Sequence, residues 1–289
     1  MFKKLLKYDI RAISKLWWIG AVSSVAAAIV GSVLIRFYTY AQENAEKNIV
    51  LGLISTFAII VAVLCVAVIF LAFVFTVVLV YVRFYRHFFT DEGYLTFTLP
   101  VKRSTLFLSK TVNALIWFFA HFAVIAVSIL LFAMLVCPTE DTGFFINLAV
   151  FEGIGEFFAE GWSAVGAWLI VYVIEAVLVI LISLVYSITL VHFCITFGSV
   201  IAKKAKLIAS IGLYYAISST LAAIGQFGGA VIAMFMSGGM KIFMENATRA
   251  ESCSAVALLI LVALCVLASV AAVFYSLTQY MLDRKLNLA

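Results

Sequence analysis

The chain has 289 residues, of which 66% are hydrophobic and only 11% are charged. A soluble domain carries about 45–50% apolar and about 25% charged residues, so this composition excludes a water-soluble fold of this size. It predicts an all-α integral membrane protein. The net charge of +5 does not indicate nucleic-acid binding, because basic residues that flank membrane spans report the topology of the chain.

The N-terminal residues 1–16 combine an apolar stripe with a basic opposite face. The stripe consists of Phe2, Leu5, Leu6, Ile10 and Ile13 and continues to Trp17. This pattern is typical of a helix that lies in the headgroup plane, where apolar burial and attraction to anionic lipid hold it. The alternative is a solvated basic tail that only sets the topology.

Six apolar runs with at most one charged residue each are long enough to cross the hydrocarbon core, which needs about 20 helical residues. They cover residues 17–38, 49–82, 112–136, 162–201, 207–236 and 255–282. The fourth run is long enough for two short passes, but residues 167–197 contain no Gly, Pro or Asn to turn the chain. We therefore predict one long helix there, and a single transmembrane domain of six spans over residues 1–289.

Basic residues are distributed unequally between the two sides that this topology creates. All but four of the 19 Lys and Arg residues lie at the termini or in the second and fourth connections between spans. The four others are Arg36, Lys47, Lys241 and Arg249. The positive-inside rule places the lysine-rich side in the cytoplasm, which predicts a multi-pass protein of the cell membrane with both termini inside.

The cytoplasmic connection after the second span contains a predicted short helix over residues 90–100. Thr90 is expected to cap it through its hydroxyl, and Asp91 and Glu92 suit the positive end of the helix dipole. Pro100 ends the helix, and Ser104 can cap the helix that leads into the third span. The segment is unusually apolar for a loop, with Tyr94, Leu95, Phe97 and Leu99. Such a patch on a soluble face predicts a docking element.

The same stretch resembles the permeases of ABC type-2 transporters. In that family the loop between the second and third spans combines a glutamate, a glycine and a leucine with a following P-V, a basic residue and a lysine. The corresponding residues here are Glu92, Gly93, Tyr94, Leu95, Leu99, Pro100, Val101, Arg103 and Lys110. The family also has an interfacial N-terminal helix, six spans and inward termini.

The resemblance implies that this chain is the membrane-spanning subunit of an exporter with an unidentified substrate. It implies a coupling helix that inserts into a separate cytosolic ATPase, formed by Asp91, Glu92, Gly93, Tyr94, Leu95, Leu99 and Pro100. It further implies a homodimer, or a heterodimer with a second permease. ATP would bind the partner, because a phosphate-binding G-x-x-x-x-G-K-[ST] loop is absent and no Gly-Lys dipeptide occurs. We expect no enzymatic activity, no cofactor and no metal site in this chain.

Two segments toward the outer side are less regular. Residues 143–162 place Glu152, Glu156 and Glu160 at four-residue intervals, which predicts a surface-lying amphipathic helix or, alternatively, an acidic lip for a cationic substrate. In the fifth run, glycines near the outer end, such as Gly228 and Gly229, predict a broken or re-entrant helix.

Two ionisable residues fall inside predicted spans, Glu175 in the fourth and His121 in the third. Charges at such depth are costly and often functional. Glu175 is either a neutral carboxyl bonded between helices or a partner of His121 in a substrate or proton pathway. The second reading supports an alternative function, a stand-alone secondary transporter or membrane sensor.

Overall fold

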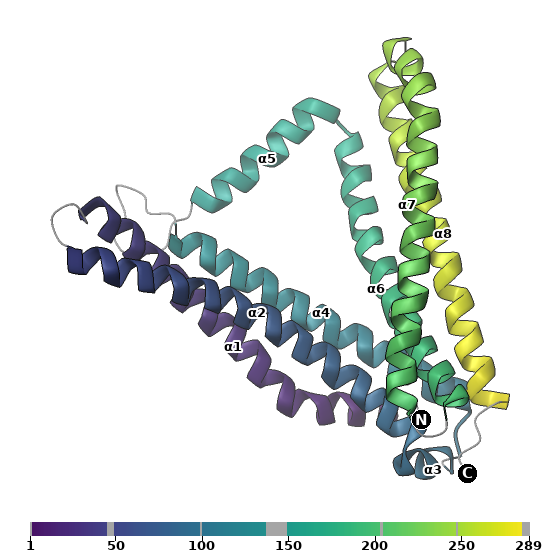
Figure 1. Cartoon of the computed structure of the whole chain (residues 1–289). Helices are drawn as coiled ribbons and strands as arrows, with labels where there is room; N and C mark the ends of the chain where they lie inside the picture. The colour runs from purple at the N-terminus through teal and green to yellow at the C-terminus, as the bar shows by residue number, and fades with distance from the viewer. Residues whose placement is uncertain are drawn as a thin grey trace. The chain divides into compact units, whose positions relative to one another are not determined.

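The computed structural model describes residues 2–44, 49–98, 100–136, 149–202, 205–246 and 248–284, and every regular element in them is a helix (Figure 1). Six of the helices are long, and α3 and α5 are short. The long helices are α1 (Phe2–Asn44), α2 (Ile49–Phe89), α4 (Arg103–Val136), α6 (Trp168–Ile201), α7 (Lys206–Asn246) and α8 (Arg249–Arg284). These six are long and apolar enough to cross a membrane. The predicted all-α class is therefore confirmed for the described residues, and its six long apolar helices are compatible with a multi-pass membrane protein.

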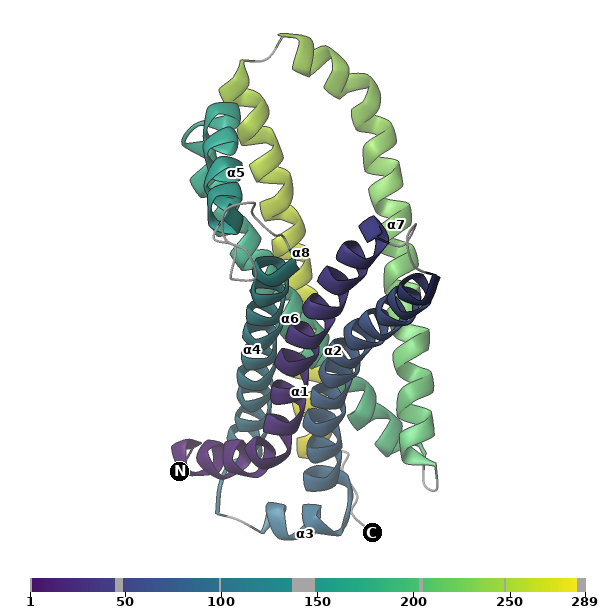
Figure 2. The same cartoon turned by 90° about the vertical axis from the view of Figure 1, so that its left-hand side faces the viewer.

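Helix α1 joins the predicted interfacial segment 1–16 and the predicted span 17–38 without a break. It bends instead, and its first turns run across the direction of the remainder (Figure 2). Continuity keeps the backbone groups of the bend hydrogen-bonded within the helix, which an interruption near lipid would leave unpaired.

The fourth predicted span begins later than expected. Helix α5 (Ala149–Val165) ends just before Gly166, and α6 starts at Trp168, so the prediction of one helix over 162–201 was wrong at its N-terminal end. Gly166 has a φ of 61°, a left-handed conformation that glycine adopts without a Cβ clash and that commonly ends a helix. The N–H of Gly166 donates to the carbonyl of Trp162 at 2.7 Å.

The predicted break in the fifth run is absent. Helix α7 continues through Gly228 and Gly229 to Asn246. A helical glycine costs about 1 kcal/mol relative to alanine, whereas an unpaired backbone group in hydrocarbon costs several kcal/mol. The continuous helix is the cheaper arrangement.

The chain forms two compact units, and the first comprises Met1–Arg83 and Val112–Ala159. Its helices approach closely where α1 carries small residues. A Cβ at Gly20 would lie 3.5 Å from the ring of Phe75, and one at Gly31 would lie 3.2 Å from the Cβ of Cys65. Small residues allow such close contact between helices in membranes, where packing rather than a hydrophobic driving force holds helices together.

The second unit comprises Phe84–Thr111 and Glu160–Ala289. Helix α6 packs against both α7 and α8 in it, with Leu190, Cys194 and Phe274 forming a buried apolar cluster. Near the end of α6, a Cβ at Gly198 would collide with Ser210 of α7, whose backbone nitrogen would be only 2.6 Å away. Glycine at this position therefore sets how closely α6 and α7 approach.

We expect Gly198→Ala to destabilise the second unit by roughly 1–3 kcal/mol, the usual cost of overpacking, because the obstructing atoms include backbone. Gly212→Ala in α7 is the matched control, since nothing lies within 4 Å of its added Cβ. That change should leave stability equal or slightly higher, since alanine favours helix. Thermal unfolding of the purified protein measures both, and equal midpoints for the two variants would contradict this account of the α6 and α7 contact.

Candidate functional site

The predicted short helix is present as α3 (Asp91–Phe97), held between the end of α2 and the start of α4 (Figures 1 and 2). Thr90 links α2 to α3 in an extended conformation, with φ of −118° and ψ of −175°. Pro100 lies in the bend that leads to α4. Leu99 lies outside the described residues, and so does the side chain of Tyr94.

Thr90 does not cap α3 as predicted. Its hydroxyl donates instead to the carbonyl of Arg86 at 2.6 Å, within α2, and α3 has no side-chain cap. The backbone carbonyl of Thr90 accepts the N–H of Gly93 at 2.7 Å. The prediction failed because the hydroxyl points back to the last turn of α2, where it finds a carbonyl acceptor, and does not accept from the free N–H groups of α3.

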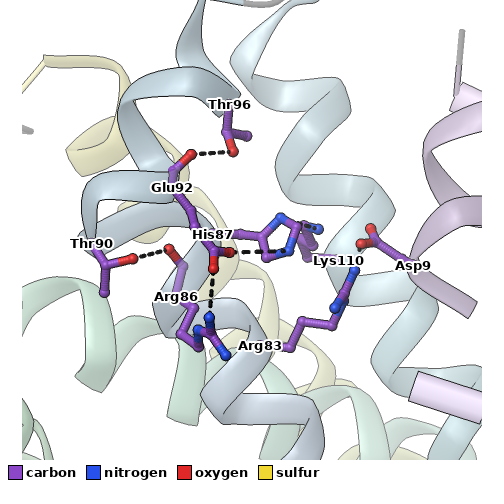
Figure 3. Close-up of polar contacts among 8 residues, drawn as sticks. All are labelled: Asp9, Arg83, Arg86, His87, Thr90, Glu92, Thr96 and Lys110. Atoms are coloured by element: carbon purple, nitrogen blue, oxygen red, sulfur yellow. Dashed lines mark hydrogen bonds and ion pairs between the residues drawn. The ribbon is translucent and has the colours of Figure 1, made fainter. Parts of the chain in front are cut away.

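A chain of polar contacts joins α3 to the neighbouring helices (Figure 3). Arg86 of α2 donates from Nη2 to Oε1 of Glu92 at 2.6 Å, and Nε2 of His87 lies 3.8 Å from Oε2 of the same carboxylate. On the other side of the ring, Lys110 Nζ of α4 lies 3.1 Å from His87 Nδ1.

The lysine contact assigns the tautomer of His87. An ammonium group only donates, so His87 Nδ1 accepts from Lys110 and the ring proton is placed on Nε2, facing Glu92. The carboxylate of Glu92 thus receives one charged hydrogen bond from Arg86 and faces the ring N–H. The sequence did not predict the roles of Arg86 and His87, because their separation from Glu92 matches no helical spacing across the turn at Thr90.

Gly93 lies where α3 turns back against the end of α2. A Cβ on it would be 2.8 Å from the carbonyl oxygen of Phe88 and 3.0 Å from its carbonyl carbon. Real Cβ atoms do not approach backbone this closely, so only glycine fits without moving α3. Gly93 is one of the residues on which the family resemblance rests, and in this chain the close approach of Phe88 explains why a glycine is needed there.

Arg103, at the start of α4, contacts both α3 and the end of α8. Its guanidinium lies 5.0 Å from the centre of the Phe97 ring. Its Nη1 donates to the carbonyls of Leu282 and Asp283, at 2.6 and 3.0 Å. These carbonyls belong to the last turn of α8, where a helix leaves acceptors unpaired. One side chain at the N-terminus of α4 thus contacts α3 and caps α8.

An aromatic cluster underlies α3. Phe88 packs against Phe97 with ring centres 5.6 Å apart and against Phe84 at 5.1 Å. Phe84 in turn stacks on His192 of α6 at 3.9 Å, and Phe107 of α4 lies 4.7 Å from Tyr275 of α8. The side chains of Phe84, Phe88, Phe107 and His192 are fully buried. The sequence signal for this cluster is the run of aromatics around Arg86, which the predicted span 49–82 leaves in the cytoplasmic connection.

The opposite side of α3 is exposed. Asp91, Leu95 and Thr98 are exposed, at a spacing that places them on one helix face, and Leu95 is 69% accessible. Gly93 and Phe97 thus face inward, whereas Leu95 faces outward.

The two predicted intramembrane residues lie in different units. His121 is fully buried in the first unit, where its Nδ1 lies 2.9 Å from the hydroxyl oxygen of Thr76. Glu175 belongs to the second unit and is 6% accessible, and its Oε2 has no hydrogen-bond partner among the described residues. Thr76 is thus a contact of His121 that the sequence did not predict, and pairing of His121 with Glu175 stays a prediction.

The described part of the chain contains no group of three or more His, Cys, Asp or Glu side chains that could hold a metal ion. Comparison with known proteins identifies no relative, since no family model, curated protein or solved structure matches the chain. The features of this chain that bear on its function are therefore α3 and the residues that contact it.

We expect Gly93→Ala to displace α3 from α2 and to loosen its backbone, because the added methyl meets the backbone of Phe88. The cost should be roughly 1–3 kcal/mol of local stability, so amides of residues 90–98 should exchange with deuterium about tenfold faster or more. Thr98→Ser on the exposed side is the control and should change this rate little, because it keeps the hydroxyl that donates to the carbonyl of Leu95 at 2.8 Å. Unchanged exchange in Gly93→Ala would show that α3 tolerates the methyl group.

We expect Arg103→Met to fray the last turn of α8, because two carbonyls lose a charged donor. Hydrogen bonds to charged groups contribute about 1.5–3 kcal/mol, so exchange in the last turn of α8 should rise at least about tenfold. Lys102→Met removes the same charge from the exposed neighbouring residue and should leave this turn protected. Equal fraying in both variants would assign the effect to net charge.

Proposed function

We propose that this chain is the permease subunit of an ATP-binding-cassette exporter and that α3 is its coupling helix. The observation that carries the proposal is a short helix with an exposed leucine, fixed to several longer helices at one end of the second unit. Leu95 is 69% accessible on a segment that the predicted topology places outside the lipid, so a monomer would leave this apolar side chain in water. Exposed apolar side chains within a polar rim are typical of a protein interface.

The contacts that hold α3 in place would let it pass a force from a bound partner to the longer helices. Glu92 ties it to α2 through Arg86, and Gly93 rests on the backbone of Phe88. Arg103 links it to the start of α4 and the end of α8. Because packed, hydrogen-bonded elements deform little, a push on α3 would move these helix ends together.

The energy for transport would come from a cytosolic ATPase, because the sequence contains no phosphate-binding loop of its own. Two permease copies, or this chain and a second permease, would bind two ATPase subunits. Closure of the ATPases around ATP would press on both coupling helices and shift the helix bundles between inward-open and outward-open arrangements. The unequal distribution of Lys and Arg supports the placement of α3 and both termini in the cytoplasm.

A second candidate function rests on the buried ionisable residues. His121 and Glu175 are both buried within apolar helices, as in ion-coupled transporters and membrane sensors. That function requires no partner. Ion-driven transport by liposomes that contain this chain alone would favour it over the exporter.

We expect Leu95→Glu to abolish binding of the ATPase while the membrane domain stays folded, because the carboxylate would have to be buried in the cleft of the partner. Tyr8→Glu is the matched control, since Tyr8 is equally exposed at 69% and lies on α1. The measurement is affinity purification of the tagged chain from its native membrane, with identification of the co-purified proteins and assay of their ATP hydrolysis.

An ATPase with a phosphate-binding loop should co-purify with the wild type and with Tyr8→Glu, and be lost with Leu95→Glu. Retention of that ATPase by Leu95→Glu, or absence of any ATPase from the wild-type complex, would contradict the proposal.

A further inference from the structure

The first turns of α1 have a buried face and a basic face. Asp9, Ile13 and Trp17 recur every four residues and are all buried, at 3–6% accessibility. Lys3, Lys7 and Arg11 also recur every four residues, but all are exposed. Since residues four apart lie on the same side of a helix, the two sets define two distinct faces.

The rotation of this segment about its axis is fixed within the first unit. The carboxylate of Asp9 pairs with Arg83 of α2, with 3.4 Å between Oδ1 and Nε. Asp9, an acid within the basic N-terminal segment, thus points inward, and its charge is compensated by Arg83. Trp17 packs against Trp117 of α4, with ring centres 5.0 Å apart. These contacts leave the basic face directed away from the bundle.

An open hollow of about 480 Å³ lies along this segment, between the buried face and the basic face. Its lining consists of Lys3, Leu6, Lys7, Ile10, Arg11 and Ser14. The leucine and isoleucine are half-buried and border the buried face, whereas the cations border the exposed face. The hollow therefore combines an apolar wall with three positive charges.

We propose that this hollow binds the headgroup of an anionic phospholipid. The cations of Lys3, Lys7 and Arg11 match the charge of a phosphate, and Leu6 and Ile10 suit the glycerol and upper acyl region that adjoins it. The location fits as well, because Trp18 and Ile19, which follow on α1, are 61% and 62% accessible and are expected to face lipid. Nucleic acid would match the charges but not the apolar wall or the adjoining membrane span.

The test is lipid titration of the purified full-length chain in detergent, with bound lipid counted by native mass spectrometry. Phosphatidylglycerol is the anionic probe and phosphatidylcholine the zwitterionic one. Lys7→Gln/Arg11→Gln removes two charges from the hollow. Lys4→Gln/Lys15→Gln removes two charges from the same helix outside the hollow and is the matched control, and thermal unfolding verifies that both variants fold.

The hollow variant should bind phosphatidylglycerol about tenfold more weakly than the control, because two cations close to the phosphate are lost. Binding of phosphatidylcholine should not differ between the variants. Lys7→Arg/Arg11→Lys keeps both positive charges and should bind phosphatidylglycerol as tightly as the wild type does. Equal weakening in both double variants would overturn the site in favour of general surface charge. Displacement of the lipid by millimolar inorganic phosphate, or by an acidic protein that co-purifies only when Lys7 and Arg11 are present, would also overturn it.

Discussion

Inside hydrocarbon, every backbone amide and carbonyl needs a partner from the chain itself, and the architecture of this protein follows from that constraint. Its described elements are all helices, and α1 and α7 continue where their sequences favour an interruption. Some buried hydroxyls obey the same constraint, whereas those of Ser109 and Ser128 have no hydrogen-bond partner among the described residues. Ser24, Thr76 and Thr278 each donate to the carbonyl four residues earlier in their own helix, so that these polar groups enter an apolar layer without an unpaired hydrogen.

At the end of α2, the start of α4 and the end of α8, polar groups find their hydrogen-bond partners in side chains and not within their own helix. Arg103 supplies donors to the free carbonyls of α8, and Arg86 supplies one to Glu92. The aromatic side chains of Phe84, Phe88 and Phe107 beneath them are fully buried, whereas the side chains of Arg86 and Glu92 stay 62% and 45% accessible. The short helix α3 is therefore held in part by the same side chain, Arg103, that caps the end of α8.

Positive charge has three separate uses in this chain. The overall bias of Lys and Arg sets the predicted topology. Arg83, Arg86 and Arg103 have local partners and hold elements together. Lys3, Lys7 and Arg11 face outward beside the hollow of α1. A net-charge figure alone hides this division, because it counts the cations that hold elements together and the outward-facing cations alike.

The sequence by itself determined the all-α class, the six spanning helices and the presence of a short helix after Thr90. These follow from local properties: length of apolar runs, helix signals and the position of Pro100. It did not determine the turn at Gly166, because a left-handed residue in a long apolar run is permitted by the local pattern but is not required by it. Only the tertiary structure showed that Gly93 rests on Phe88, that Arg103 caps α8 and that Thr76 contacts His121. The physical reason is that these contacts join residues 5 to about 180 positions apart, and neither periodicity nor composition carries information about which helix ends meet.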